Sequence, residues 1–109
     1  MSQRIAKIES LIQHVAASTL PGLLEGDAAA VTVTRVDVSP DMRNAIIWLG
    51  LLGPESDHER LLKRIHGRRP ELQAIVAGRL TTKFVPRLTF KLDTGGAYAA
   101  TIDRLLRNS

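Results

Sequence analysis

The spacing of apolar residues changes twice along this chain, and that change constrains the fold more than any other feature of the sequence. Apolar side chains recur at helical intervals up to about residue 19, alternate along a segment after residue 30, and return to helical intervals between residues 57 and 80. A last alternating segment follows Pro86. A chain of 109 residues is long enough for one hydrophobic core, so these segments must share it. The sequence therefore predicts a single α+β domain.

The first helix is predicted over about residues 2–19. The apolar stripe along it consists of Ile5, Ile8, Leu11, Ile12 and Val15. A polar row on the opposite face consists of Gln3, Lys7, Ser10 and His14. We expect Pro21-Gly22 to end this helix and residues 23–30 to form a loop.

A two-stranded hairpin is predicted next. Residues 31–38 are rich in β-branched side chains, and a slip in their alternation between Val33 and Val36 indicates a β-bulge. Residues 39–41 have the composition of a turn, and residues 45–49 form a continuous apolar run. We therefore expect an antiparallel partner strand at residues 45–49.

Two helices that meet at a sharp joint are predicted between residues 57 and 80. Ser56 and Glu59 have the spacing of a capping box, which would begin the first of these helices. Gly67 and Pro70 interrupt the apolar pattern. Because a proline is tolerated in the first turn of a helix, where its missing N–H would have no partner, we place the joint at these residues.

A third strand and a short C-terminal helix are expected after Pro86. Leu88, Phe90 and Leu92 alternate with polar residues, and an apolar pattern at helical spacing follows around residues 102–106. The predicted order is thus α-β-β-α-α-β, with helices covering one face of a three-stranded sheet. The predicted core contains Ile8, Ile12, Val36, Ile47, Leu62, Ile65, Leu72, Val76 and Phe90.

Positive charge is concentrated in one segment. The chain has a net charge of +4, but residues 1–59 hold eight acidic and four basic residues, whereas residues 60–91 hold nine basic residues and one acidic residue. A segment of this kind, here called the basic block, is typical of a nucleic-acid-binding surface. A solvated helix face that is basic for solubility is the alternative interpretation.

Several kinds of chemistry are excluded or disfavoured by the sequence. The chain has no cysteine, which excludes disulfides, thiolate zinc sites and a cysteine nucleophile. His14, His58 and His66 lack the spacing of metal ligands, and there is no phosphate-binding loop, so we expect neither a metal nor a cofactor. Asp93-Thr94-Gly95 resembles the catalytic string of dimeric aspartic proteases, but only 16 residues follow Asp93. We expect this aspartate to be structural and the protein not to be an enzyme.

The N-terminal segment lacks the features of a secretory signal, and no segment reaches the roughly 18 apolar residues of a membrane span. We therefore expect a cytoplasmic protein that does not bind membranes and is a monomer when free.

Three stretches of the sequence resemble the ribosome-binding factor A family. They are VTVTRVDVSPD at residues 31–41, AIIWL at residues 45–49 and KFVPRLTFKLD at residues 83–93. The last is similar to the family signature Arg-x-x-Pro-x-Leu-x-Phe-x-x-Asp, with Lys83 in the place of the opening arginine. Where the family joins its two helices with Ala-x-Gly, this chain has Arg68-Arg69-Pro70.

The resemblance implies a KH-like domain of type II over residues 1–109, in which residues 92–109 form a short C-terminal extension. It also implies a non-catalytic assembly factor that binds the immature small ribosomal subunit and its ribosomal RNA during late rRNA processing, with a role in cold adaptation. Two alternatives belong to other classes. One is a DNA-binding module, because two jointed helices superficially resemble a helix-turn-helix, and the other is a basic protein-interaction domain.

The residues expected to contact RNA are basic side chains of the basic block and of the first helix. They are Arg64, Arg68, Arg69, Arg79, Lys83 and Arg87, with Arg4 and Lys7 as flanking contacts. Arg68 and Arg69 are the strongest candidates, because we expect them to be exposed at a helix N-terminus, where the helix dipole also favours a phosphate. The other aromatic residues lie in or beside apolar runs, so we expect only Tyr98 to stack on a base.

Overall fold

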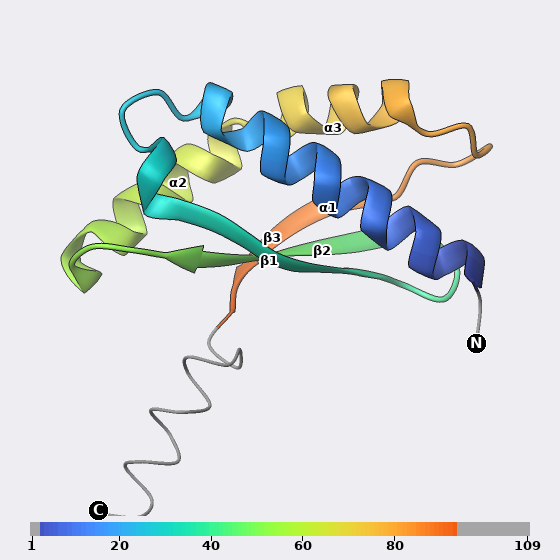
Figure 1. The fold of residues 1–109 in the computed structure, drawn as a ribbon, viewed down its shortest axis with the longest axis horizontal. Helices are drawn as coiled ribbons and strands as arrows, with labels where there is room; N and C mark the ends of the chain where they lie inside the picture. Colours follow the sequence, from blue (N-terminus) through green and yellow to red (C-terminus); the bar gives the residue numbers. More distant parts are fainter. Residues whose placement is uncertain (1–2, 94–109) are drawn as a thin grey trace, which may run out of the picture.

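Three helices and a three-stranded sheet make up residues 3–93, the part of the chain that the computed structural model describes (Figure 1). The helices are α1 (Gln3–Leu23), α2 (His58–Gly67) and α3 (Arg69–Arg79). The strands are β1 (Val31–Val38), β2 (Asn44–Leu51) and β3 (Arg87–Leu92), and short 3-10 turns at Ala28–Ala30 and Glu55–Asp57 precede β1 and α2. The predicted order of elements is confirmed, while the expected C-terminal helix and Tyr98 lie outside the described residues.

The sheet has the strand order β1-β2-β3 and combines both kinds of pairing. β1 is antiparallel to β2, whereas β2 is parallel to β3. The register shifts between Val33 and Arg35, which confirms the predicted bulge. Since parallel neighbours cannot be joined by a tight turn, the chain crosses from β2 to β3 through α2 and α3. Two rows of buried side chains run across the three strands, Val36–Ile47–Phe90 and Val38–Ala45–Leu88.

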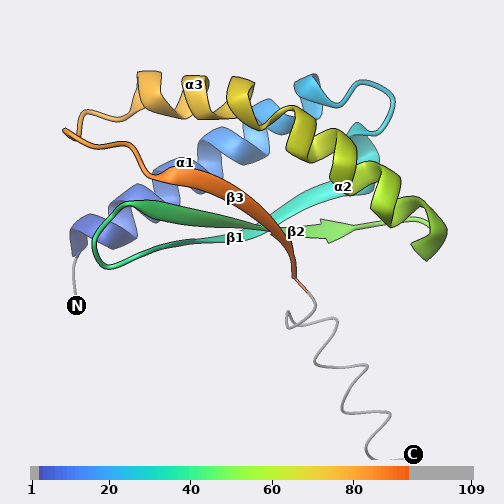
Figure 2. The same ribbon diagram turned by 180° about the vertical axis from the view of Figure 1, so that it is seen from behind.

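All three helices lie on the same face of the sheet, as the two opposite views show (Figures 1 and 2). α1 runs alongside α3 and also packs on β1. Ile12 of α1 and Leu72 of α3 are fully buried and belong to one hydrophobic cluster with the two strand rows. Burial of these apolar stripes against a common sheet face is the main stabilising contribution to the fold.

The opposite face of the sheet carries polar and aromatic side chains. Arg35, Trp48 and Lys91 lie in one row across the strands. The guanidinium of Arg35 lies over the Trp48 ring, 4.7 Å from its centroid, and the indole N–H donates to Asp37 at 2.9 Å. These contacts involve neighbouring strands and support the hairpin.

α1 continues past the residue at which we expected it to end. Pro21 lies inside the helix, so the prediction that Pro21-Gly22 terminates it is wrong. The proline removes one backbone hydrogen bond near the helix end, where the loss is small. Leu20 and Leu24 flank it and are fully buried, and this burial offsets the lost bond.

The start and the buried stripe of α2 also differ from the prediction. Ser56 lies in a 3-10 turn, and Asp57 precedes the helix without a side-chain capping bond, so the capping-box prediction is wrong. The predicted core is confirmed except for Leu62, which is only half-buried. Leu61 is 1 % exposed instead, and with Ile65 it forms the inward stripe of the helix.

Replacement of these two adjacent leucines should have unequal effects. Leu61→Ala removes a fully buried side chain and should lower the free energy of unfolding by about 2–5 kcal/mol. Leu62→Ala removes a half-buried side chain, and its effect should be clearly smaller. Urea unfolding followed by circular dichroism measures both effects. An equal or larger effect of Leu62→Ala would contradict the orientation of α2 in which Leu61 faces the protein interior.

Candidate nucleic-acid interface

The first part of the basic block is neutralised by carboxylates. Asp27, in the turn between α1 and β1, accepts hydrogen bonds from Arg60 and Arg64 of α2. The Arg60 Nη1–Asp27 Oδ2 distance is 3.1 Å. The hydrogen bonds from Arg60 and then from Arg64 lower the pKa of Asp27 below its usual value. These two arginines therefore attach α2 to the end of α1.

Arg68 is likewise engaged within the protein. Its Nε donates to the carbonyl oxygen of Leu23 at 3.0 Å, and its Nη1 lies 2.7 Å from the Glu71 carboxylate. Arg68 and Arg69 are both half-buried, so the expectation that both would be exposed is wrong. The first turn of α3 already contains the carboxylate of Glu71, which reduces the attraction of that helix terminus for a phosphate.

The second part of the basic block is open to solvent. Arg79 ends α3, Lys83 lies in the following loop, and Arg87 begins β3; all three are exposed. None of them forms an ion pair with another described residue, in contrast to Arg60, Arg64 and Arg68. We call these three residues the open basic cluster.

Arg43 lies beside this cluster, although it is not among the residues predicted to contact RNA. Its carbonyl oxygen accepts a hydrogen bond from the Arg87 N–H at 2.8 Å, which places the turn between β1 and β2 next to the start of β3. Arg43 stands in the net-negative part of the sequence, so a count of charges along the chain could not single it out. The parallel pairing of β2 with β3 brings it there.

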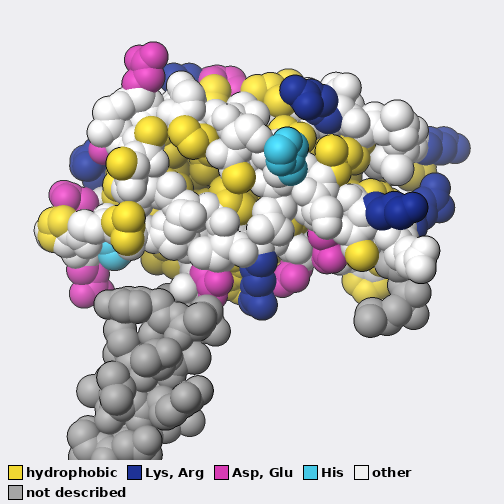
Figure 3. Space-filling view, viewed as in Figure 1, with side chains coloured by type: hydrophobic (Ala, Val, Ile, Leu, Met, Phe, Trp, Pro, Cys, Tyr) yellow, Lys and Arg dark blue, Asp and Glu magenta, His cyan; other side chains and the backbone are white. Residues whose placement is uncertain are grey.

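The beginning of α1 lies at the same end of the molecule. Figures 1 and 2 place the start of α1, the β1–β2 turn and the α3–β3 loop at one end of the fold. Arg4 and Lys7 are exposed there, five and two residues before Glu9, whose carboxylate accepts the Val38 N–H at the end of β1. In the space-filling view, Lys and Arg side chains gather on this end, whereas Asp and Glu side chains lie at the opposite end and along the lower edge (Figure 3).

The loop that carries Lys83 is fixed by a side-chain clamp. The Gln73 amide of α3 donates to the carbonyl oxygen of Pro86 at 2.8 Å and accepts the Leu88 N–H at 2.9 Å. Pro86 is fully buried. These bonds satisfy backbone groups at the outer edge of the sheet and hold the entry into β3 against α3.

Phe84 differs from the expectation for the aromatic residues. It was expected to lie with the apolar runs, but its side chain is 67 % exposed. Phe90, by comparison, is buried in the core, and Trp48 is half-buried on the sheet. An exposed aromatic ring therefore lies beside the open basic cluster.

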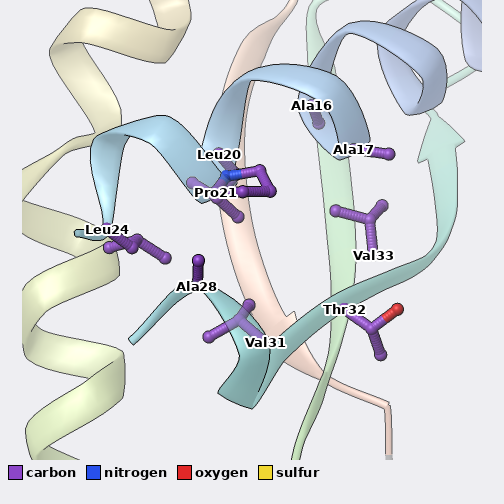
Figure 4. A pocket seen from close by; sticks show the side chains of 9 residues that line it. All are labelled: Ala16, Ala17, Leu20, Pro21, Leu24, Ala28, Val31, Thr32 and Val33. Atoms are coloured by element: carbon purple, nitrogen blue, oxygen red, sulfur yellow. The ribbon is translucent and has the colours of Figure 1, made fainter. Parts of the chain in front are cut away.

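A small apolar cavity of about 100 Å³ lies between the end of α1 and β1 (Figure 4). It is lined by Ala16, Ala17, Leu20, Pro21, Leu24, Ala28, Val31, Thr32 and Val33. No titratable side chain lines it, so it offers no acid, base or nucleophile. Within residues 3–93, no three His, Asp or Glu side chains are grouped to hold a metal ion, and no helix has the length and apolar character to cross a membrane.

Comparison with known proteins gives one consistent result. The family profile described as Ribosome-binding factor A matches residues 4–106. A ribosome-binding factor A from Thermomicrobium roseum is 34% identical over 107 residues, covering 97% of this chain and 83% of the relative. One from Rhodospirillum rubrum is 37% identical over 109 residues, covering 96% of this chain and 66% of the relative.

Solved structures agree on the fold. The solution structure of a putative ribosome binding factor A from Thermotoga maritima has a TM-score of 0.76 at 24% identity, covering 89% of this chain and 93% of that chain. The crystal structure of ribosome-binding factor A from Thermus thermophilus has a TM-score of 0.70 at 23% identity, covering 81% and 94%. The predicted KH-like α+β fold is confirmed.

The Asp27 contacts predict how stability changes with pH. Because the pKa of this carboxyl is lower in the folded chain than its usual value of 3.8, its contribution to stability is present above that value and is lost as the pH falls through the folded pKa. Asp27→Asn should lower the urea midpoint at neutral pH, and the difference from wild type should shrink in acid. A difference that is absent at neutral pH, or that persists in strong acid, would contradict this role of Asp27.

Proposed function

The chain belongs to the ribosome-binding factor A family, and on this basis we propose that it is an assembly factor that binds the small ribosomal subunit. A homology model of ribosome-binding factor A from Thermus thermophilus has been fitted into the electron cryomicroscopy map of a complex of that protein with the 30S subunit, which supports the proposal. The observation that carries it furthest is the open basic cluster, whose cations have no acidic partner among the described residues. Phosphates of ribosomal RNA are the matching charges.

The more detailed part of the proposal concerns the state of the subunit. The protein binds the immature subunit during late rRNA processing, including in the cold, and leaves it afterwards. It acts in the cytoplasm and is a monomer when free. Its affinity comes mainly from contacts with phosphates, which depend little on sequence, and selectivity comes from the shape of the RNA.

We rank the proposed RNA contacts by whether each side chain is already held in an ion pair. Arg79, Lys83 and Arg87 can reach phosphates without breaking an ion pair to another described residue, although the Lys83 ammonium lies over the Phe84 ring, and Arg43 joins them. Arg4 and Lys7 remain flanking contacts, and Arg69 remains a contact beside the joint. Arg64 and Arg68 would first have to leave Asp27 and Glu71, so their proposed contribution to binding is smaller.

A DNA-binding helix-turn-helix is less well supported. Such a motif reads base edges in the major groove with polar side chains on the second helix. The exposed face of α3 before Arg79 consists of Pro70, Glu71, Ala74, Ala77 and Gly78. It therefore offers no basic or amide side chain for base recognition. An acidic protein partner for the open basic cluster remains the competing hypothesis.

We further propose that the protein has no catalytic activity. The Asp93 carboxylate accepts a hydrogen bond from Thr34 Oγ1 at 2.6 Å, and the Asp93 N–H donates to Leu49. These contacts join the end of β3 to the other strands, in keeping with a structural role.

Substitution of Asp93 tests that role. Asp93→Asn retains an acceptor for Thr34 but removes the charge, so it should lower the free energy of unfolding by about 1 kcal/mol or less and leave RNA affinity unchanged. Neither wild type nor the variant should cleave peptides in a fluorogenic assay. Cleavage by the wild type that Asp93→Asn abolishes would show a protease instead.

The open basic cluster gives the main test of RNA binding. Lys83→Ala combined with Arg87→Ala should weaken binding to small-subunit RNA and reduce the slope of log affinity against log salt by about 1.4 to 1.8, since each phosphate contact contributes about 0.7 to 0.9. Filter binding over a salt series measures this slope.

A matched control is Lys63→Ala combined with Lys91→Ala. These lysines are exposed on α2 and on the uncovered sheet face, so the charge change is the same and binding should remain near wild type. Equal losses in both double variants would indicate a general charge effect and contradict the assigned site. Tighter binding to an acidic protein or to duplex DNA than to ribosomal RNA would favour those alternatives.

A further inference from the structure

We propose that Phe84 is a stacking surface for one unpaired base, so that the α3–β3 loop directs this domain to single-stranded segments of ribosomal RNA. This inference rests on the proposed RNA binding and adds a specific ligand, an unpaired nucleotide, to the open basic cluster. Phe84 does not belong to the hydrophobic core of the protein.

The exposure of Phe84 is unusual for its residue type in this fold. Phe84 and Leu52 are the only large hydrophobic side chains described as exposed in residues 3–93, at 67 % and 63 %. Phenylalanine is normally buried, because its large apolar surface is costly to leave in water. An aromatic side chain that lies outside the core and next to cations is therefore a candidate for contact with a ligand.

The chain around Phe84 is anchored, so its outward position is built into the loop. Leu80 and Val85 pack against the hydrophobic core on either side of it, and Pro86 is fully buried. Thr82 Oγ1 donates to the carbonyl oxygen of Phe84 at 2.9 Å. Together with the Gln73 clamp, these contacts fix the backbone before any partner arrives. A preformed surface loses less conformational entropy on binding than a loop that must become ordered.

The charges around the ring match a nucleotide. Lys83 Nζ lies over the Phe84 ring, 5.5 Å from its centroid, which leaves the opposite face of an exposed ring for a base. Arg79 and Arg87 flank the loop and are available for the adjoining phosphates. An apolar face beside several unpaired cations suits a nucleotide, which presents a flat ring and an anionic backbone together.

An unpaired base is required because of the structure of RNA. In an A-form duplex the faces of the bases are stacked on each other, and the deep, narrow major groove does not admit side chains. Only a base in a loop, a bulge or a single strand can present its face to Phe84. The cluster by itself would bind duplex and single strand alike, so Phe84 is the residue that separates them.

The test compares two RNA probes of equal length and charge, one a fully paired hairpin and the other carrying an unpaired segment. Phe84→Ala and Phe84→Leu in the full chain should lower affinity for the second probe by about 5- to 150-fold, the range for loss of one stacked base. Affinity for the paired probe should change less than about twofold. Phe84→Trp should retain binding, and its tryptophan fluorescence should be quenched by the unpaired probe beyond the quenching seen in wild type.

Leu52→Ala is the control, since it removes an exposed apolar side chain from the segment after β2 and should bind as wild type does. Thermal unfolding should be nearly unchanged for the Phe84 variants because the side chain is exposed.

Three outcomes would overturn the inference. They are binding of Phe84→Leu equal to that of wild type, equal losses of affinity for both probes, and a loss of affinity confined to a ribosomal protein. If Lys83→Ala with Arg87→Ala weakens RNA binding while the Phe84 variants do not, the proposed function stands and this inference fails. If wild type binds neither probe, both fail.

Discussion

Parallel pairing of β3 with β2 is the constraint on which the arrangement of the other elements depends. Two parallel neighbouring strands must be joined by a crossover connection, and α2 and α3 form the connection from β2 to β3. The Gln73 side chain of α3 then forms hydrogen bonds with the backbone on both sides of Arg87. As a result, the end of α3, the following loop and the β1–β2 turn meet at one end of the fold, which is how residues distant in sequence form one basic surface.

Ion pairing divides the basic block into two parts with different roles. Asp27 pairs with Arg60 and Arg64, which attaches α2 to the turn after α1. Arg68 pairs with Glu71 at the start of α3 and donates to the carbonyl oxygen of Leu23 at the end of α1. The open basic cluster has no such partners among the described residues. A cation without an internal partner keeps its full attraction for an external anion, and this is why the surface proposed to bind RNA lies at the end of the fold opposite to Asp27.

Much of the fold followed from local patterns, and the errors lie where tertiary packing overrode those patterns. Alternation and helical spacing predicted each helix and strand between residues 3 and 92, but not the two 3-10 turns, and they also predicted the bulge near Val33 and the joint before Pro70. The end of α1 was misplaced because the burial of Leu20 and Leu24 outweighs the weak terminating effect of Pro21. Leu62 was chosen over Leu61 because a short helix with both residues permits either rotation, and the packing against the rest of the fold selects one.

The sequence by itself determined the element order, the apolar faces and the segment in which positive charge is concentrated, because each is a property of neighbouring residues. Only the tertiary structure decided which cations are neutralised, that Arg43 joins the cluster, and that Phe84 faces solvent. Asp27 meets Arg60 and Arg64 across 33 and 37 residues of chain. No local pattern specifies such a contact, because it depends on how the helices pack on the sheet.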